Sequence, residues 1–313
     1  MLIGSKLPPE RIERTYFHTG RAAFSFLIGQ VIRPNKVYLP TFTCWSLVSA
    51  MARRFPQVEL EFYPVRRDLT CSYPEQVREG EALLFIHFFG HENVGALPLC
   101  EGTLIEDFSH SYMSQISPRG HYVFGSYRKI MKVADGGFLW GFFNPVYEPS
   151  RKLDSWLRFE AKDWRDVREA ENMLDRDWSI ADISSQSLEI LLTANEPLIR
   201  QKRQNNERYL ARNLSVGTPQ ITYRKKECPL LHNRLMPTPE ERDSLRAYLA
   251  SKGIFTSIHW PTHDLVHKCG LDIEDTLWIE KHVISFPVTH EYGINDMEYI
   301  CHWVEEWKQG NGQ

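Results

Sequence analysis

Two short segments carry residues whose types and spacing could do chemistry. IEDFSHS (105–111) places Asp107 and His110 directly after an apolar run, and FGSYRKIMKVADGGFL (124–139) follows with Lys129 and a Gly-Gly pair. A lysine amine can condense with an aldehyde in its neutral form, which burial and neighbouring cations favour. Each of these residues alone is common in surface turns, so only their ordered combination indicates a site.

Pyridoxal phosphate (PLP) needs such a lysine, together with a carboxylate that faces its ring nitrogen. It also needs a cradle for its phosphate, for which the N–H groups at a helix start are well suited. Gly20, Arg21 and Ala22 open a predicted helix, Asp107 ends a predicted strand, and Lys129 lies beyond it. We therefore expect a PLP site in which Lys129 and Asp107 are the catalytic residues.

The composition is that of an ordinary globular protein. The 313 residues are 42% hydrophobic and 25% charged, enough for a large core. A net charge of −3 gives no reason to expect nucleic acid or an anionic membrane as partner. Six cysteines without a C-x-x-C pattern favour reduced thiols over a zinc site or a disulfide framework. No signal peptide or membrane span is visible, and we expect a cytoplasmic protein without a metal.

Apolar runs and amphipathic stretches alternate in the first two-thirds of the chain, which predicts a mostly parallel α/β sheet. The predicted strands are 36–40, 59–65, 82–90 and 102–108, and the predicted helices between them include 20–32 and 43–55.

The pattern changes in the last third. A polar helical region over 183–214 is expected to end a large PLP-binding domain, residues 1–214, and to lead into a small α+β domain, residues 215–313. The small domain is predicted to contain a strand near 221–224, a helix over 238–253 and a last helix over 294–309.

The chain resembles the DegT/DnrJ/EryC1/StrS family of PLP-dependent sugar aminotransferases over nearly its whole length. That family carries Glu-Asp-x-x-Gln/His, here Glu106 to His110, and Lys-x5-Asp/Glu-Gly-Gly, here Lys129 to Gly137. The spacing selects Lys129 and not Lys132. The resemblance implies the aspartate aminotransferase fold type I, in which a large domain with a seven-stranded, mostly parallel sheet precedes a smaller α+β domain.

The resemblance also implies roles for single residues. It implies a contact of His110 with the phenolic oxygen of PLP. His259, together with Trp260 and Pro261, is interpreted either as lining the substrate entrance or as part of a structural loop. The resemblance implies that the cofactor is further held by Gly20, Arg21, Ala22 and Ser126 at the phosphate and by Cys44 or Trp45 on the ring. Phe124 occupies the place of the family's phosphate-binding serine, and Asp177 that of an asparagine supplied by the neighbouring subunit.

The activity implied by the resemblance is transfer of an amino group from glutamate to a keto sugar, linked to a nucleotide, for polysaccharide or secondary-metabolite synthesis. A homodimer is also implied, and the charged stretch 150–180, with Trp156, Trp164 and Trp178, suits its interface. Two alternatives stay open. One is another PLP reaction on this fold, a dehydration or epimerisation, and the other is a non-catalytic homologue with a decayed site.

Several other residues have simpler interpretations. His87, at a predicted strand end, is expected to be a packed or capping histidine. The basic run 200–203 is expected on the solvated face of a helix. His263 and His267 are four residues apart and could bind a metal on a helix, but no third ligand is evident.

Overall fold

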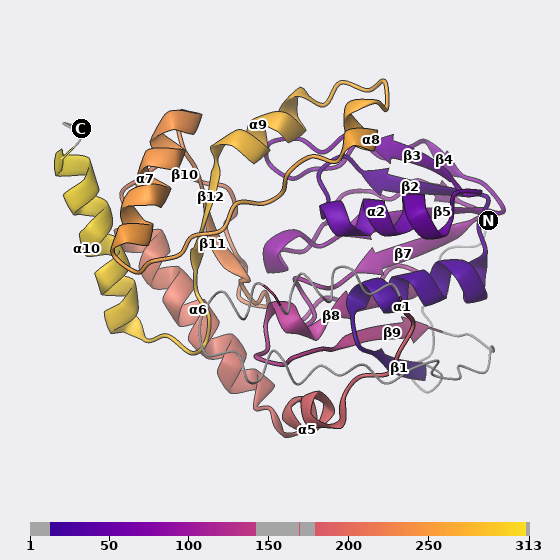
Figure 1. The fold of residues 1–313 in the computed structure, drawn as a ribbon, viewed down its shortest axis with the longest axis horizontal. Helices are drawn as coiled ribbons and strands as arrows, with labels where there is room; N and C mark the ends of the chain where they lie inside the picture. The colour runs from indigo at the N-terminus through magenta and orange to yellow at the C-terminus, as the bar shows by residue number, and fades with distance from the viewer. Residues whose placement is uncertain (1–12, 142–168, 170–178, 311–313) are drawn as a thin grey trace.

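A seven-stranded sheet forms the centre of the larger part of the molecule (Figure 1). The computed structural model describes residues 13–141, 169 and 179–310. The strand order is β1-β9-β8-β7-β5-β2-β3. Neighbouring strands from β3 to β8 run parallel, whereas β9 is antiparallel to both β8 and β1. The predicted mostly parallel sheet is thereby confirmed.

The strands of this sheet are β1 (Glu13–Phe17), β2 (Lys36–Pro40), β3 (Glu59–Tyr63), β5 (Glu81–Ile86), β7 (Thr103–Asp107), β8 (Tyr122–Ser126) and β9 (Gly137–Gly141). A separate pair, β4 (Gln76–Val77) and β6 (Leu99–Cys100), runs parallel beside it.

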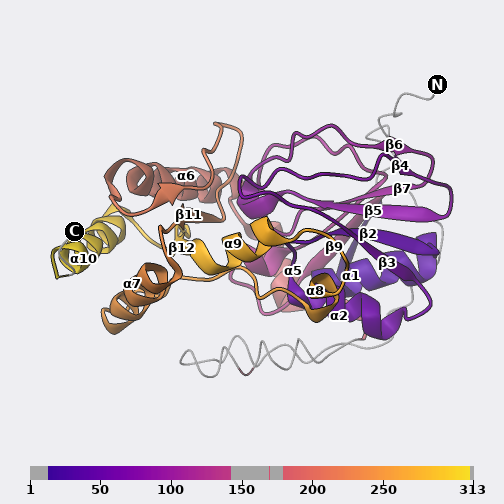
Figure 2. The same cartoon turned by 90° about the horizontal axis from the view of Figure 1, so that it is seen from above.

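Both faces of the sheet are covered, which explains why the interior strand β5 is apolar from Ala82 to Ile86. All six residues of β5 are buried. Ala82 and Leu84 face a core shared with α1 (Gly20–Phe26) and α2 (Trp45–Arg54). Leu83 and Phe85 face a second core on the opposite side. Figure 2 shows α1 and α2 on one side of the sheet and the β4–β6 pair on the other.

The predicted helix over 20–32 is present, and its second half is a π-helix and not an α-helix. After α1 the chain continues without a break into the π-helix η2 (Leu27–Ile32). The predicted helical region over 183–214 is two helices, α5 (Ser185–Thr193) and α6 (Glu196–Asn213). Asn195 begins α6 by accepting a hydrogen bond from the Leu198 N–H.

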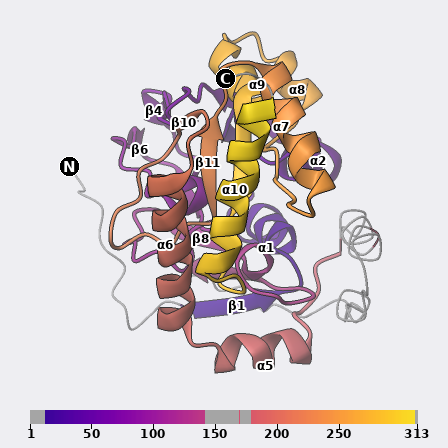
Figure 3. The ribbon, with the colours of Figure 1, turned by 90° about the vertical axis from the view of Figure 1, so that its left-hand side faces the viewer.

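The C-terminal part is built on a three-stranded antiparallel sheet, β10-β11-β12. Its helices α6 and α10 lie side by side across this sheet (Figure 3). Its core joins the end of α6 to α7, α10 and β12, through residues such as Leu210, Leu249, Phe286 and Trp307. The elements are β10 (Thr218–Pro219), β11 (Leu231–Leu235), α7 (Pro239–Ser251), α8 (Asp264–His267), α9 (Glu274–His282), β12 (Val283–Pro287) and α10 (Ile294–Gly310).

The prediction of a strand near 221–224 is wrong. These four residues form no strand, and the strands on either side of them are β10 and β11. In place of strand pairing, Tyr223 donates a hydrogen bond from its hydroxyl to the carbonyl of Phe89 in the large part. The division into domains 1–214 and 215–313 stays a prediction. Of the stretch 150–180, residues 150–168 and 170–178 lie outside the described residues, as do Trp156, Trp164, Asp177 and Trp178.

Candidate active site

The candidate residues gather where parallel strands of the large sheet end. Ile86 closes β5, Asp107 closes β7 and Ser126 closes β8, and Ile86 and Asp107 are paired across the two strands. The carboxyl ends of parallel strands are where ligands bind in open α/β sheets. A cavity of about 290 Å³ lies at this edge.

Most of the predicted site residues line this cavity. They are Gly20, Arg21, Cys44, Trp45, Asp107, His110, Ser126 and Lys129. Ala22 does not line it: its side chain is buried in the core, and its N–H donates to the Thr19 hydroxyl that caps α1. His259 lies instead on a second cavity of about 330 Å³. Lys129 and Arg128 line both cavities, so the two cavities meet at Lys129.

The Gly-Gly pair lets β9 pass against the start of α1. A Cβ on Gly137 would lie 2.2 Å from the carbonyl of Thr19, and Gly136 has a positive φ of 138°. A Cβ on Gly20 would lie 2.9 Å from the carbonyl oxygen of Gly125. These close approaches hold the first turn of α1 beside the end of β8, where Ser126 lies. The glycines therefore shape the end of the cavity at which the phosphate is expected.

Asp135, the acid of the lysine motif, has a structural role. It is fully buried, and its carboxylate accepts from the hydroxyl and the N–H of Ser184 at 2.7 and 3.0 Å. Ser184 in turn caps the start of α5. The segment after Lys129 is thus anchored to the helix that follows the long undescribed stretch.

Asp107 presents a desolvated carboxylate to the cavity. One of its oxygens accepts from the Ser109 N–H at 2.7 Å, and the residue is 9% exposed. Burial raises its pKa, against the smaller opposing effects of Ser109, His87 and Lys129. A cation placed against this carboxylate would offset the burial, because an opposite charge stabilises the ionised form. The pyridinium N–H of PLP is such a cation.

His110 is held as a neutral hydrogen-bond donor. Its Nδ1 accepts from the N–H of Phe89 at 3.2 Å, so its proton resides on Nε2. Burial lowers its pKa well below the usual value, and the charge of Lys129 lowers it further. The indole of Trp260 stacks on the ring with centroids 5.4 Å apart. His110 can therefore donate to an anionic oxygen in the cavity across the pH range of most enzymes.

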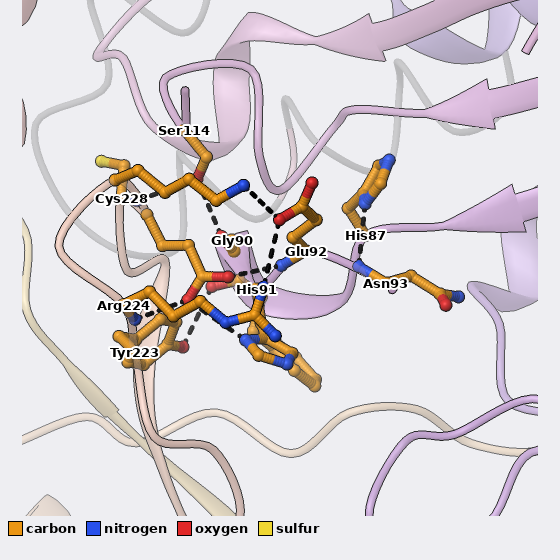
Figure 4. Close-up of polar contacts among 12 residues, drawn as sticks. His87, Gly90, His91, Glu92, Asn93, Ser114, Tyr223, Arg224 and Cys228 are labelled. Atoms are coloured by element: carbon orange, nitrogen blue, oxygen red, sulfur yellow. Dashed lines mark hydrogen bonds and ion pairs between the residues drawn. The ribbon is translucent and has the colours of Figure 1, made fainter. Parts of the chain in front are cut away.

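The loop that positions His110 is clamped by a segment of the C-terminal part (Figure 4). The loop is the short helix η3 (Phe88–Gly90), and the carbonyl of Phe89 accepts from the Tyr223 hydroxyl and the Leu230 N–H. Ser114 donates to the carbonyl of Gly90 and accepts from the Cys228 N–H, at 2.7 and 2.8 Å. The Phe89 N–H that orients His110 is thereby fixed by contacts from both parts of the chain.

A buried carboxylate closes the same clamp. Glu227 accepts from His91 Nδ1 at 3.1 Å and from the N–H groups of Glu92 and Arg224 at 2.9 and 2.7 Å. Burial alone would raise its pKa, but these hydrogen bonds outweigh it and the pKa is lowered. Arg224 also pairs with Glu92, a contact visible in Figure 4.

His87 is a packed histidine, as expected. Its Nε2 donates to Glu106 at 2.8 Å, and its Nδ1 accepts from the Asn93 N–H at 3.0 Å. The side chains of His87 and Glu106 are both fully buried. Glu106 also accepts from the backbone N–H groups of Arg119 and Gly120. The two acids of the Glu-Asp motif therefore differ in function. Glu106 holds the end of β7 through buried hydrogen bonds, whereas Asp107 faces the cavity.

Lys129 ends the short helix η4 (Tyr127–Lys129) and is exposed at the junction of the two cavities. Its ammonium has no hydrogen bond or ion pair with any described residue, which leaves it able to turn into either cavity. Lys132 points elsewhere: it is 84% exposed and pairs with Glu291 at 3.4 Å. The geometry thus separates the two lysines in the same sense as their spacing.

Three residues at these cavities, Thr43, Arg128 and Arg203, were not predicted as site residues. Thr43 lines the first cavity, and its hydroxyl is buried without a hydrogen-bond partner in the described part of the chain. Trp260 and Arg128 line the same cavity. Arg203, expected on a solvated face, is 2% exposed and lines the second cavity. The turn Pro-x-x-Thr at 40–43, which follows a predicted strand, is a local signal for Thr43, whereas nothing in the neighbouring sequence marks Arg203.

The two candidates for ring stacking occupy the start of α2. Cys44 is its N-cap, with Sγ 3.1 Å from the hydroxyl of Ser46, and Trp45 is 45% exposed. The ring of Trp45 contacts that of His263, with centroids 5.2 Å apart. His263 is otherwise engaged by the hydroxyl of Ser49 and the N–H of Leu265.

No group of three or more histidine, cysteine or acidic side chains among the described residues lies close enough to hold a metal ion. All six cysteines are free thiols. The helices of the described ranges include none with the length and apolarity needed to cross a membrane.

Comparison with known proteins gives no match to a protein-family model and none to a curated protein. Solved structures do match. PseC of Helicobacter pylori, an aminotransferase of pseudoaminic acid biosynthesis, is 12% identical with a TM-score of 0.65, covering 95% of this chain and 87% of its own. A DegT DnrJ EryC1 StrS aminotransferase from Brucella abortus is 14% identical with a TM-score of 0.63, covering 94% and 86%.

A third match is Spr1654 of Streptococcus pneumoniae, assigned as a sugar aminotransferase and solved in its PLP form. It is 12% identical with a TM-score of 0.64, covering 95% of this chain and 87% of its own. The chain has the fold of these aminotransferases. The expected fold type I architecture is thereby confirmed, although the sequences have diverged far.

Proposed function

We propose that the protein is a PLP-dependent aminotransferase that transfers an amino group, from glutamate, to a keto sugar carried on a nucleotide. The observation that carries the proposal is the position of Lys129 in the lining of two cavities, one of which is also lined by Asp107 and His110. A transaminase needs its lysine between cofactor and substrate, because the lysine amine both holds the cofactor and moves a proton at the substrate carbon. The folds of PseC and Spr1654 support the sugar and the cofactor.

The residues of the first cavity fit PLP, which supplies an electron sink when bound. Asp107 would hold the ring nitrogen protonated, and His110 would donate from Nε2 to the phenolic oxygen. Gly20, Arg21 and Ser126 would hold the phosphate. Thr43 adds a buried hydroxyl in need of a partner. Lys129 would hold the cofactor and then move a proton at the substrate carbon.

Borohydride reduction tests the assignment of the lysine. PLP-loaded protein is reduced and digested, and we expect the pyridoxyl group on Lys129. Lys129→Ala should lose at least about 100-fold in rate, as expected for loss of a general acid–base. Lys132→Ala is the matched control and should keep both label and activity. A label on Lys132 would show that the motif is misaligned.

The reaction class is tested with a panel of nucleotide-linked keto sugars and glutamate. Formation of 2-oxoglutarate and an amino sugar is expected, and Asp107→Asn should bind PLP but lose most of the rate. A deoxygenated or epimerised sugar would identify one of the alternative PLP reactions. Absence of visible PLP absorption from the purified protein would favour the non-catalytic homologue.

We also propose a cytoplasmic homodimer. The six free thiols suit a reducing compartment, and the tryptophan-rich stretch 150–180 suits a subunit interface. Light scattering on the purified protein should give about twice the chain mass of 36.7 kDa. An active monomer at assay concentration would contradict the dimer.

A further inference from the structure

The second cavity is strongly cationic. Its volume is about 330 Å³, and it shares Arg128 and Lys129 with the candidate cofactor cavity. The polar side chains that line it are Arg128, Lys129, Arg203, Ser257, His259 and Thr289, and no acidic residue in the described part of the chain joins them. Three cations, two hydroxyls and no carboxylate form a surface that an anionic ligand would complement.

Arg203 is the deepest of these cations. Its Nε donates to the carbonyl of Pro229 at 2.8 Å and its Nη2 to that of Leu230 at 2.7 Å. The remaining nitrogen, Nη1, has no hydrogen-bond partner among the described residues. No carboxylate of that part of the chain forms a salt bridge with the guanidinium either. Burying a guanidinium without an acidic partner costs free energy. Two backbone carbonyls hold the guanidinium of Arg203 in one orientation, and an anionic ligand would supply the missing partner.

The contacts of Arg203 also fix where its guanidinium is. Pro229 and Leu230 lead into β11, and the N–H of Leu230 is bound to Phe89 in the loop that orients His110. The cationic cavity is therefore built on the same clamp as the candidate cofactor cavity. These shared contacts fix the position of one cavity relative to the other, with Lys129 between them.

His259 completes one wall as a neutral group. Its Nδ1 lies 3.2 Å from the hydroxyl of Ser285, and burial together with Lys129 lowers its pKa to about 3. The ring therefore adds a hydrogen-bonding edge without adding to the positive charge. The charge of the cavity comes from Arg128, Lys129 and Arg203.

We propose that this cavity is the subsite of the amino donor, and that Arg203 binds a carboxylate of a dicarboxylic amino acid with help from Ser257 and Thr289. This inference rests on the proposed function. An amino acid carries a carboxylate on the carbon that bears its amine, so the cation must lie close to the lysine at which that amine reacts. The volume, at the low end for ligand pockets, suits a five-carbon diacid better than a nucleotide diphosphate.

Binding to the PLP-loaded protein tests the subsite without turnover. Isothermal titration calorimetry measures 2-oxoglutarate and succinate, with uridine diphosphate as the phosphate probe. We expect the diacids to bind and Arg203→Lys to weaken them about 10- to 100-fold, because the planar fork is lost. Arg208→Lys is the matched control: Arg208 lies exposed on the same helix, so binding should not change.

Because Arg203 also binds two backbone carbonyls, a gentler variant is needed. Thr289→Val keeps the branched shape and should weaken the diacids about 2- to 10-fold, the range for one neutral hydrogen bond. In steady state, both variants should raise KM for glutamate, with little change in KM for the sugar. Wild-type diacid affinity in both variants would overturn the inference, as would binding of uridine diphosphate, and not of the diacids, that depends on Arg203.

The two proposals fail in different ways. If the diacids bind through Arg203 but no amino group is transferred, the proposed function is wrong and the diacid site stands. If transamination occurs but diacid affinity is independent of Arg203 and Thr289, the inference is wrong and the proposed function stands.

Discussion

Replacement of His110 should make the protein less sensitive to acid. The ring is buried beside Phe89 and Trp260, and burial keeps its pKa in the folded state well below the usual value of 6.5. In the unfolded chain the ring titrates normally. Below pH 6.5 the unfolded state therefore binds a proton that the folded state does not, and acid favours unfolding.

The magnitude follows from linkage. Stability from the neutral ring is fully present above pH 6.5 and is lost as pH falls toward the pKa of the folded state. For one such histidine the loss between pH 8 and pH 5.5 is ~1.4 kcal/mol. His110→Gln lacks the titrating ring, so its unfolding free energy should fall by ~1.4 kcal/mol less over this range.

The assay is urea unfolding of cofactor-free protein at a series of pH values, by circular dichroism. His110→Asn is a second variant that also cannot titrate. The two variants should differ in absolute stability, because they pack differently against Phe89, but they should share one pH dependence. If wild type and both variants lost the same free energy between pH 8 and 5.5, the ring would titrate alike in both states, and the role of burial would be refuted.

Two further predictions concern the scaffold of the site. Gly137→Ala places a Cβ 2.2 Å from the Thr19 backbone. It should lower the free energy of unfolding by ~1–3 kcal/mol and weaken PLP binding. Gly293→Ala, with no atom near its Cβ, is the matched control; equal melting temperatures would contradict the packing argument. Glu106→Gln removes the buried charge and replaces the oxygen that accepts from His87 with an NH2 donor, which leaves two donors facing each other, and should cost ~3 kcal/mol in urea unfolding. An unchanged midpoint would mean that these contacts contribute little.

The local pattern of the chain was enough to predict most strands of the large sheet and most of the candidate residues that line its cavity. The predicted strand 36–40 is β2 itself, because a short buried run with a terminal proline has few other solutions. Asp107 ends β7 and His110 lies three residues beyond it, and Lys129 lies three residues beyond the end of the neighbouring strand β8. Strand order alone therefore brings these residues to one edge of the sheet. These are properties of residues close together in sequence.

Contacts between distant segments decided the rest. Nothing within 221–224 shows that it would give up strand pairing to clamp Phe89, and so the strand there was predicted wrongly. Nothing within 200–203 shows that one of its cations would turn inward, because the carbonyls that bind Arg203 come from residues 229 and 230. A hydrogen bond to a distant carbonyl leaves no periodicity in either segment. Local signals therefore determined the strand ends that carry Asp107 and Lys129, and only the folded chain determined the second cavity beside them.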